Sequence, residues 1–180
     1  DVIARHESLR TVYPSHDGTA YQKVLAAAVS IPDLELIEAV ADFGAPADRL
    51  GETDMAVSLY EFARRGFDVT ATAPVRLRVY ELGEREHVLV MVVHHIAADG
   101  FSLRPLVRDL MTAYVARTAN AEPGWPPLAV QYVDYALWQR ETLGDENDPT
   151  SLISEQLEHW RGALADLPDE LRLGHKSRPA

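Results

Sequence analysis

Residues 87–115 read HVLVMVVHHIAADGFSLRPLVRDLMTAYV, and this stretch decides the fold. Residues 87–93 are apolar almost throughout, which predicts a strand that lies inside a sheet. From Leu103 to Val115 apolar residues recur at steps of three and four, which predicts an amphipathic helix. We expect Pro105 in the first turn of this helix, where an amide has no internal partner. The order is therefore strand, tight turn and helix, with two histidines and Asp99-Gly100 in the turn.

The residues upstream predict further strands and one helix. Residues 75–82 alternate between apolar and polar, which is typical of a half-buried strand, and Gly83 to Glu86 supply a turn into 87–93. Residues 53–65 have helical spacing, with Thr53 or Asp54 as the N-cap. The pattern over 34–40 fits either a strand or a short helix.

A hairpin is predicted near the start of the chain. Residues 8–13 and 20–27 read as its strands, on either side of a turn at 14–18. Asp17-Gly18 favours this turn because the dipeptide adopts the positive backbone dihedral that such turns need. Two more helices are predicted at 130–143 and 151–167. Together these elements indicate one α/β or α+β domain with a mixed sheet flanked by helices.

Composition excludes several classes of function. The chain has 180 residues, of which 47% are hydrophobic, enough for one sizeable core. A formal net charge of −11 argues against nucleic acid and anionic membrane as partners, since both are bound through clustered Lys and Arg. There is no cysteine, which removes thiolate nucleophiles and Cys-ligated metals. With no signal peptide and no apolar stretch near 18 residues, we expect a cytoplasmic location.

The paired histidines allow several interpretations. Neighbouring side chains on a strand point to opposite faces, so His94 and His95 cannot readily converge on one metal ion, and no HExxH motif occurs. The plainest alternative is a pair of half-buried histidines hydrogen-bonded to carbonyls, followed by a simple Asp-Gly turn. We expect Gly100 to relieve backbone strain after Asp99. The exposed amides at the helix start could bind an anionic or carbonyl oxygen.

Four motifs, in one order along the chain, resemble those of a known family. His94 to Gly100 fit HHxxxDG, the signature of the condensation domains of non-ribosomal peptide synthetases and of related CoA-dependent acyltransferases such as chloramphenicol acetyltransferase. RHESLRT at 5–11 resembles the family's RHExLRT, and YVDYALW at 132–138 resembles YxDYAxW. Gly66-Phe67-Asp68, followed by APVR at 73–76, resembles FDL…PLLR. Phe101 stands where the family usually has Trp.

The resemblance implies part of a chloramphenicol acetyltransferase-like domain. Residues 1–180 would form an N-terminal lobe without its first segment, and 150–180 would lead toward a C-terminal lobe that the sequence lacks. The missing initiator Met and a start that reads as a helix already under way agree with this expectation. Because the family's active site lies in a tunnel between two lobes, we expect the chain alone to be inactive.

The resemblance also implies roles for individual residues. His95 would be the catalytic histidine, either as a general base or as a group that positions the amine, and the amide of Gly100 would lie near the reacting carbonyl. His94 would be a packing residue, and Asp99 would hold the loop by pairing with an arginine. Arg5 and Arg10 are the partners that we would test first.

The implied reaction joins an amine to a thioester. A thioester is already activated, so no covalent enzyme nucleophile is needed, and a histidine with an ordinary pKa of about 6.5 can accept the amine proton. Both substrates would arrive as phosphopantetheine thioesters on donor and acceptor carrier proteins, beside an adenylation domain. The domain itself would bind no cofactor and no metal. Alternatives are an epimerisation domain, a CoA-dependent acyltransferase, or a lobe that only folds, packs or dimerises.

Overall fold

The structure is a computed structural model that describes residues 1–30, 32, 34–38 and 54–167. The chain divides into two compact units between Val133 and Asp134. The first unit contains the β-sheet and the histidine motif, and the second contains the last helix.

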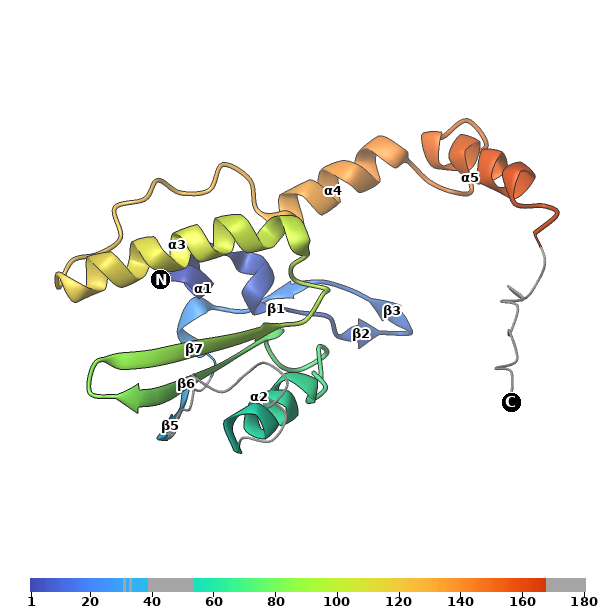
Figure 1. The fold of residues 1–180 in the computed structure, drawn as a ribbon. Helices are drawn as coiled ribbons and strands as arrows, with labels where there is room; N and C mark the ends of the chain where they lie inside the picture. Colours follow the sequence, from blue (N-terminus) through green and yellow to red (C-terminus); the bar gives the residue numbers. More distant parts are fainter. Residues whose placement is uncertain (31, 33, 39–53, 168–180) are drawn as a thin grey trace, which may run out of the picture. The chain divides into compact units, whose positions relative to one another are not determined.

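A three-stranded mixed sheet forms the centre of the first unit (Figure 1). Its strands are β5 (Leu34–Glu38), β6 (Val75–Gly83) and β7 (Glu86–Val93), in the order β5-β6-β7. β5 runs parallel to β6, and β7 runs antiparallel to it. The structure thus confirms the mixed sheet and resolves 34–38 as a strand. Residues 39 and 40 of the ambiguous segment lie outside the described residues.

The prediction that 87–93 lies inside the sheet is wrong for the described strands. β6 is the middle strand, and β7 pairs with β6 alone among the strands that the structure describes. An apolar run indicates that the two faces of a strand are shielded from water. Whether a strand is central depends instead on whether it hydrogen-bonds to a neighbour at each of its two edges. No residue of β7 is fully buried, and Leu89 is 43% exposed, so the apolar run does not mark a central strand here.

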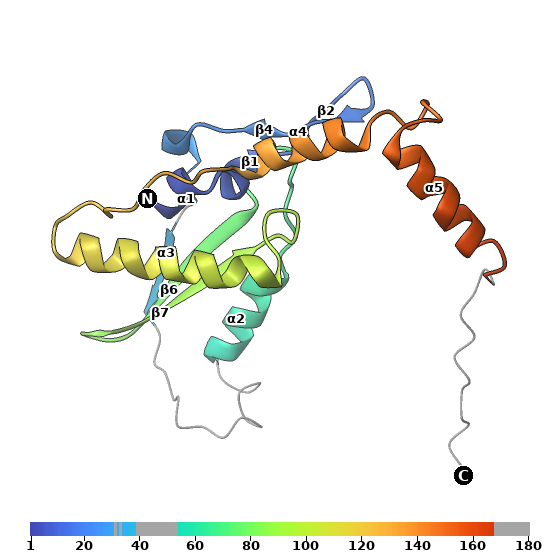
Figure 2. The same cartoon turned by 90° about the horizontal axis from the view of Figure 1, so that it is seen from above.

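Helices lie on both faces of the sheet (Figures 1 and 2). On one face lie α1 (Val2–Arg5), the 3₁₀ helix η1 (Glu7–Arg10) and α3 (Gly100–Thr118). Leu9, Val75 and Leu106 form the buried core there. α2 (Asp54–Arg64) lies on the other face, and its Phe62 is buried. The prediction of a helix over 53–65 is confirmed, although Thr53 lies outside the described residues.

A buried arginine ties the α2 face together. Arg78 of β6 is buried, and its guanidinium carbon lies 4.1 Å from the centroid of the Phe62 ring. It pairs with Glu35 of β5 and donates to the Ser58 hydroxyl at 3.1 Å and the Tyr80 hydroxyl at 3.2 Å. The hydrogen bonds from Arg78 hold the pKa of the Glu35 carboxyl below its usual value. One side chain therefore joins β5, β6 and α2.

The predicted hairpin forms, but as two short ladders. β1 (Thr11–Val12) pairs with β4 (Lys23–Val24), and β2 (Ser15–His16) pairs with β3 (Thr19–Ala20). Pro14 lies between the ladders and has no amide to donate, so the pairing is interrupted there. Strand 8–13 is shorter than predicted because residues 8–10 belong to η1, and 27–29 form the 3₁₀ helix η2 (Ala27–Val29). Asp17 and Gly18 have φ values of +50° and +78°, as the turn requires.

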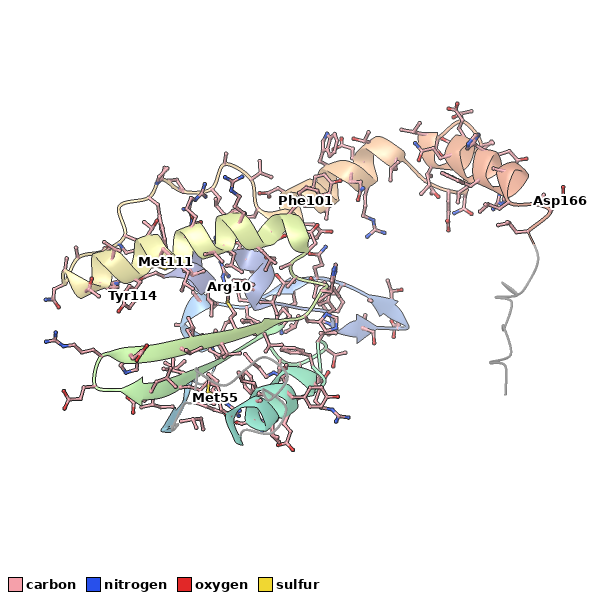
Figure 3. The ribbon with its side chains drawn as sticks, viewed as in Figure 1. Arg10, Met55, Phe101, Met111, Tyr114 and Asp166 are labelled. Carbon is pink, nitrogen blue, oxygen red and sulfur yellow. The ribbon has the colours of Figure 1, made fainter. Side chains whose placement is uncertain are left out.

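The start of α3 differs from expectation. The helix begins at Gly100, so Pro105 lies in the second turn, where its missing amide deprives the Phe101 carbonyl of a helical donor. The prediction that Pro105 occupies the first turn is wrong because Asp99 caps the helix, which begins three residues before Leu103. Leu106 and Ala113 are buried, while Phe101, Met111 and Tyr114, labelled in Figure 3, are exposed.

The second unit continues in helical structure. α4 (Tyr132–Leu143) crosses the division between the units, and α5 (Leu152–Ala163) begins at Ser151, whose hydroxyl accepts from the Ser154 amide at 3.3 Å. Both predicted helices are confirmed: α4 begins two residues later than predicted, and α5 is shorter at both ends. Within the described ranges of the chain, no helix is long and apolar enough to cross a membrane.

Leu106 provides a test of the core beneath α3. Leu106→Ala should lower the free energy of unfolding by about 2–5 kcal/mol because a cavity replaces a buried side chain. Leu103→Ala is the matched control on the same helix, since Leu103 is 53% exposed and Leu106 only 4%. Urea denaturation measures both. Equal losses would contradict the assignment of Leu106 to the core.

Candidate active site

The histidine motif occupies a tight turn between β7 and α3. The strand ends at Val93, and the amide of His94 donates to the Pro74 carbonyl at 2.9 Å. The His94 carbonyl then accepts from the amide of Ala97 at 2.9 Å. These two hydrogen bonds turn the chain away from the sheet within a few residues.

The His94 ring is held inside this turn. Its Nδ1 accepts a hydrogen bond from the Ile96 amide at 3.0 Å, so a neutral ring carries its proton on Nε2. The ring lies perpendicular to that of Phe67, with the centroids 5.8 Å apart. His94 is half-buried. The role of His94 as a packing residue stays a prediction.

His95 is the exposed member of the pair. It lies in the turn that follows β7, and its side chain is open to solvent. Its ring makes no hydrogen bond or ion pair with any residue that the structure describes. Both ring nitrogens are therefore open to a substrate. Across the same described residues, no three His, Cys, Asp or Glu side chains gather in a group that could hold a metal ion.

Asp99 caps α3. Its Oδ1 accepts from the amide of Ser102 at 2.9 Å and from its hydroxyl at 2.7 Å, while the amide of Asp99 donates to the Ser102 hydroxyl at 3.1 Å. This reciprocal arrangement is a capping box. The hydrogen bonds from Ser102 hold the pKa of the Asp99 carboxyl below its usual value. Asp99 therefore fixes where the helix begins.

The hypothesis that Asp99 pairs with Arg5 or Arg10 does not match the structure. Arg5 Nε instead donates to Asp109 Oδ2 at 2.8 Å. Arg10 lies 3.1 Å from the Glu7 carboxylate and donates to the Leu25 carbonyl, which ties η1 to the hairpin. The Asp99 carboxylate instead hydrogen-bonds Ser102 through Oδ1.

Asp109, which sequence reasoning missed, lies at the centre of a buried network. Its side chain belongs to α3, and the residue is 3% exposed. Besides the bond from Arg5, the Asp109 carboxylate accepts hydrogen bonds from His6 Nε2 at 2.9 Å and from Arg108 Nε at 3.0 Å. Burial alone would raise the pKa of the Asp109 carboxyl, but the hydrogen bonds from Arg5, Arg108 and His6 lower it below its usual value. The sequence did contain a signal for this residue. Asp109 lies three positions after Leu106, on the apolar face of the predicted helix, where an acidic side chain is unusual and needs a buried partner.

The same arginine joins the segment that precedes α4. The Arg5 guanidinium lies 4.8 Å from the centroid of the Trp125 ring and donates to the Pro126 carbonyl at 2.6 Å. Gln131 accepts from the Glu7 amide at 3.2 Å and donates to the Arg5 carbonyl at 2.9 Å. The RHE residues at 5–7 thus connect α3 with residues 125–131.

Gly100 is not required by its backbone conformation. It is the first residue of α3, its φ is not positive, and a Cβ added there would meet nothing within 4 Å. The expectation that this glycine relieves strain is wrong because the helix starts at this residue and gives it ordinary helical dihedrals.

Comparison with known proteins assigns the family. The family model described as "Condensation domain" matches residues 1–180. The chain belongs to the condensation domain family. Its four sequence motifs, predicted from resemblance, thus lie in a condensation domain, and the fold expected from that resemblance is the one observed.

Named relatives place this condensation domain among peptide synthetases. It is 46% identical over 181 residues to a dimodular nonribosomal peptide synthase of Bacillus subtilis, covering 100% of the chain and 7% of that protein. It is 48% identical over 173 residues to an isonitrile lipopeptide synthase of Mycobacterium tuberculosis, covering 96% of the chain and 7% of that protein. The chain therefore spans less than a tenth of these relatives.

A solved structure agrees with the fold. The X-domain from teicoplanin biosynthesis, in a complex with OxyB, superposes with a TM-score of 0.80 at 38% sequence identity. The match covers 100% of this chain and 37% of that one.

The two arginines on Asp109 offer a matched comparison. Arg5→Met should cost about 3–5 kcal/mol of unfolding free energy because it leaves the buried carboxylate without its buried partner. Arg108→Met should cost less than about 1 kcal/mol, since an exposed ion pair contributes little. The Arg5 side chain is 9% exposed and that of Arg108 68%. Chemical denaturation distinguishes them, and an equal loss would refute the central role of Arg5.

Proposed function

We propose that the protein containing this chain forms an amide bond between two thioesters bound to carrier proteins, with His95 at the reacting amine. The observation that carries the proposal is the exposed His95 ring beside the first turn of α3, in a chain of the condensation domain family. Its relatives are peptide synthetases, which supports aminoacyl or peptidyl groups as the substrates.

The proposed reaction balances without an enzyme nucleophile. The amine of the acceptor attacks the donor thioester carbonyl, so a C–N bond forms and the C–S bond breaks. The amine loses one proton, which the His95 ring accepts or guides, and the departing thiolate takes up one proton as the free thiol. The amide of Gly100 at the start of α3 would donate to the carbonyl oxygen as negative charge develops there.

The proposed partners follow from the carried substrates. Donor and acceptor carrier proteins would each present a phosphopantetheine arm, and an adenylation domain would lie in the same protein. A second lobe would complete the tunnel, so we expect the chain alone to be inactive, because half a tunnel cannot position two thioesters. The cytoplasm remains the proposed location.

Two related reactions are distinguishable by product. An epimerisation domain would exchange the α-proton of one carried aminoacyl group, which incorporation of deuterium from solvent detects. A CoA-dependent acyltransferase would transfer the acyl group with no carrier present. Formation of a carrier-bound dipeptide supports condensation over both.

His95→Ala tests the proposal in the full-length protein. The rate of dipeptide formation between two loaded carriers should fall by about 100-fold or more because proton transfer and amine positioning are lost. His87→Ala, at the opposite end of β7, is the control and should keep the rate of the unaltered protein. Full activity of the His95 variant would reject its proposed role.

Gly100→Ala tests the amide at the helix start. A Cβ there meets open space and suits a helix, so the melting temperature should stay unchanged or rise. Dipeptide formation should nevertheless slow by about tenfold because the methyl group keeps the carbonyl away from the amide. Thermal melting and steady-state kinetics measure the two effects. An unchanged rate would mean that no substrate atom approaches Gly100.

A further inference from the structure

The position of His95 depends on the two peptide groups that flank it. The peptide before it is fixed by the hydrogen bond from the Ala97 amide to the His94 carbonyl, at 2.9 Å. The peptide after it is fixed by the bond from the Ile96 amide to His94 Nδ1, at 3.0 Å. The first bond joins backbone to backbone, but the second needs one orientation of the His94 ring. The direction of the His95 side chain therefore depends on what orients that ring.

Phe67 is the aromatic neighbour of the His94 ring. The two planes meet at 88°, the edge-to-face arrangement that aromatic pairs prefer, with centroids 5.8 Å apart. Phe67 follows α2 in the chain and lies in a loop. It lies about 27 residues before His94, so the contact is not a local one.

Phe67 is itself fixed by a stacked arginine. The Arg76 guanidinium carbon lies 4.1 Å from the centroid of the Phe67 ring, and Arg76 also donates to the Gly66 carbonyl at 3.3 Å. Arg76 belongs to β6, so the loop is tied to the middle strand of the sheet.

The residues after Phe67 add a second support. The Asp68 carboxylate accepts from the amide of Thr70 at 3.1 Å and from its hydroxyl at 2.6 Å, which closes a small turn. The Val69 carbonyl in turn accepts from the Tyr13 amide at 2.8 Å. The loop that carries Phe67 is thus anchored on both sides of the ring.

We infer that Phe67 is a positioning residue for the amide-forming reaction, acting through the His94 ring to set the direction of His95. The inference rests on the proposed function of His95. Loss of the aromatic ring frees the His94 ring to rotate, which breaks the bond from the Ile96 amide and lets the His95 side chain swing. A swing of this kind lowers turnover without weakening the binding of carrier-bound substrates.

Phe67→Leu in the full-length protein is the principal test. Its kcat for dipeptide formation should fall by about tenfold with KM unchanged, because only the alignment of His95 is lost. Phe67→Tyr keeps the ring and should restore kcat to within about twofold. Phe62→Leu is the matched control: Phe62 also contacts Arg76 but is buried in the core on α2. It should lower the melting temperature and leave kcat per folded molecule unchanged.

A spectroscopic readout separates this inference from the proposed function. In the unaltered protein, ¹⁵N NMR of the imidazole should report His94 with its proton on Nε2, and Phe67→Leu should shift that signal toward a mixture of tautomers. An unchanged His94 signal, or a Leu variant with full kcat beside an inactive His95→Ala, would overturn the role of Phe67. If His95→Ala kept its activity, the proposed function would fail, and the His94 signal would still decide whether Phe67 orients that ring.

Discussion

The buried carboxylate of Asp109 is the interaction on which the first unit depends. It holds Arg5 and His6 against α3, and Arg5 in turn holds Trp125 and Pro126. A charged group this deep is stable only when its oxygens are hydrogen-bonded, and here both of them are. The beginning of the chain, the helix after the histidines and the approach to α4 thus share one anchor.

The two faces of the sheet are stabilised by different kinds of interaction. On the α3 face, apolar packing of Leu9, Val75 and Leu106 fixes the helix whose first residue is Gly100. On the α2 face, two arginine side chains connect the elements. Arg78 links β5 to α2, and Arg76 stacks on Phe67 in the loop after α2. The histidine turn lies where these two systems meet, so its geometry reflects both.

Much of the fold was predictable because its elements have strong local signals. Alternation over 75–82, helical spacing over 103–115 and the Asp17-Gly18 turn each led to the observed element. Strand order was not predictable, since the apolar run at 87–93 does not say which strands hydrogen-bond to its two edges. The start of α3 was misjudged because the capping role of Asp99 depends on Ser102, a pairing that the apolar pattern does not contain.

For the site, sequence motifs supplied the residues but not their contacts. The resemblance identified Arg5 and Arg10 as residues of interest, yet their acidic partners proved to be Asp109 and Glu7. Glu7 and Arg10 are neighbours within η1. Spacing along the chain cannot, however, reveal the pair of Arg5 and Asp109, which depends on how α1 and α3 meet. The contact of Phe67 with His94 has the same origin, because the loop after α2 and the end of β7 come together only in the folded sheet.

The separation of Arg5 from Asp109 along the chain bears on the order of folding. The two residues lie 104 positions apart, so their pair closes a long loop whose entropic cost must be met before the contact forms. The β6–β7 hairpin has its strands joined by a short turn and can form early, as local contacts do. We therefore expect the sheet to assemble before the chain start docks on α3. The ion pair between Arg5 and Asp109 would then be among the last contacts of the first unit to form.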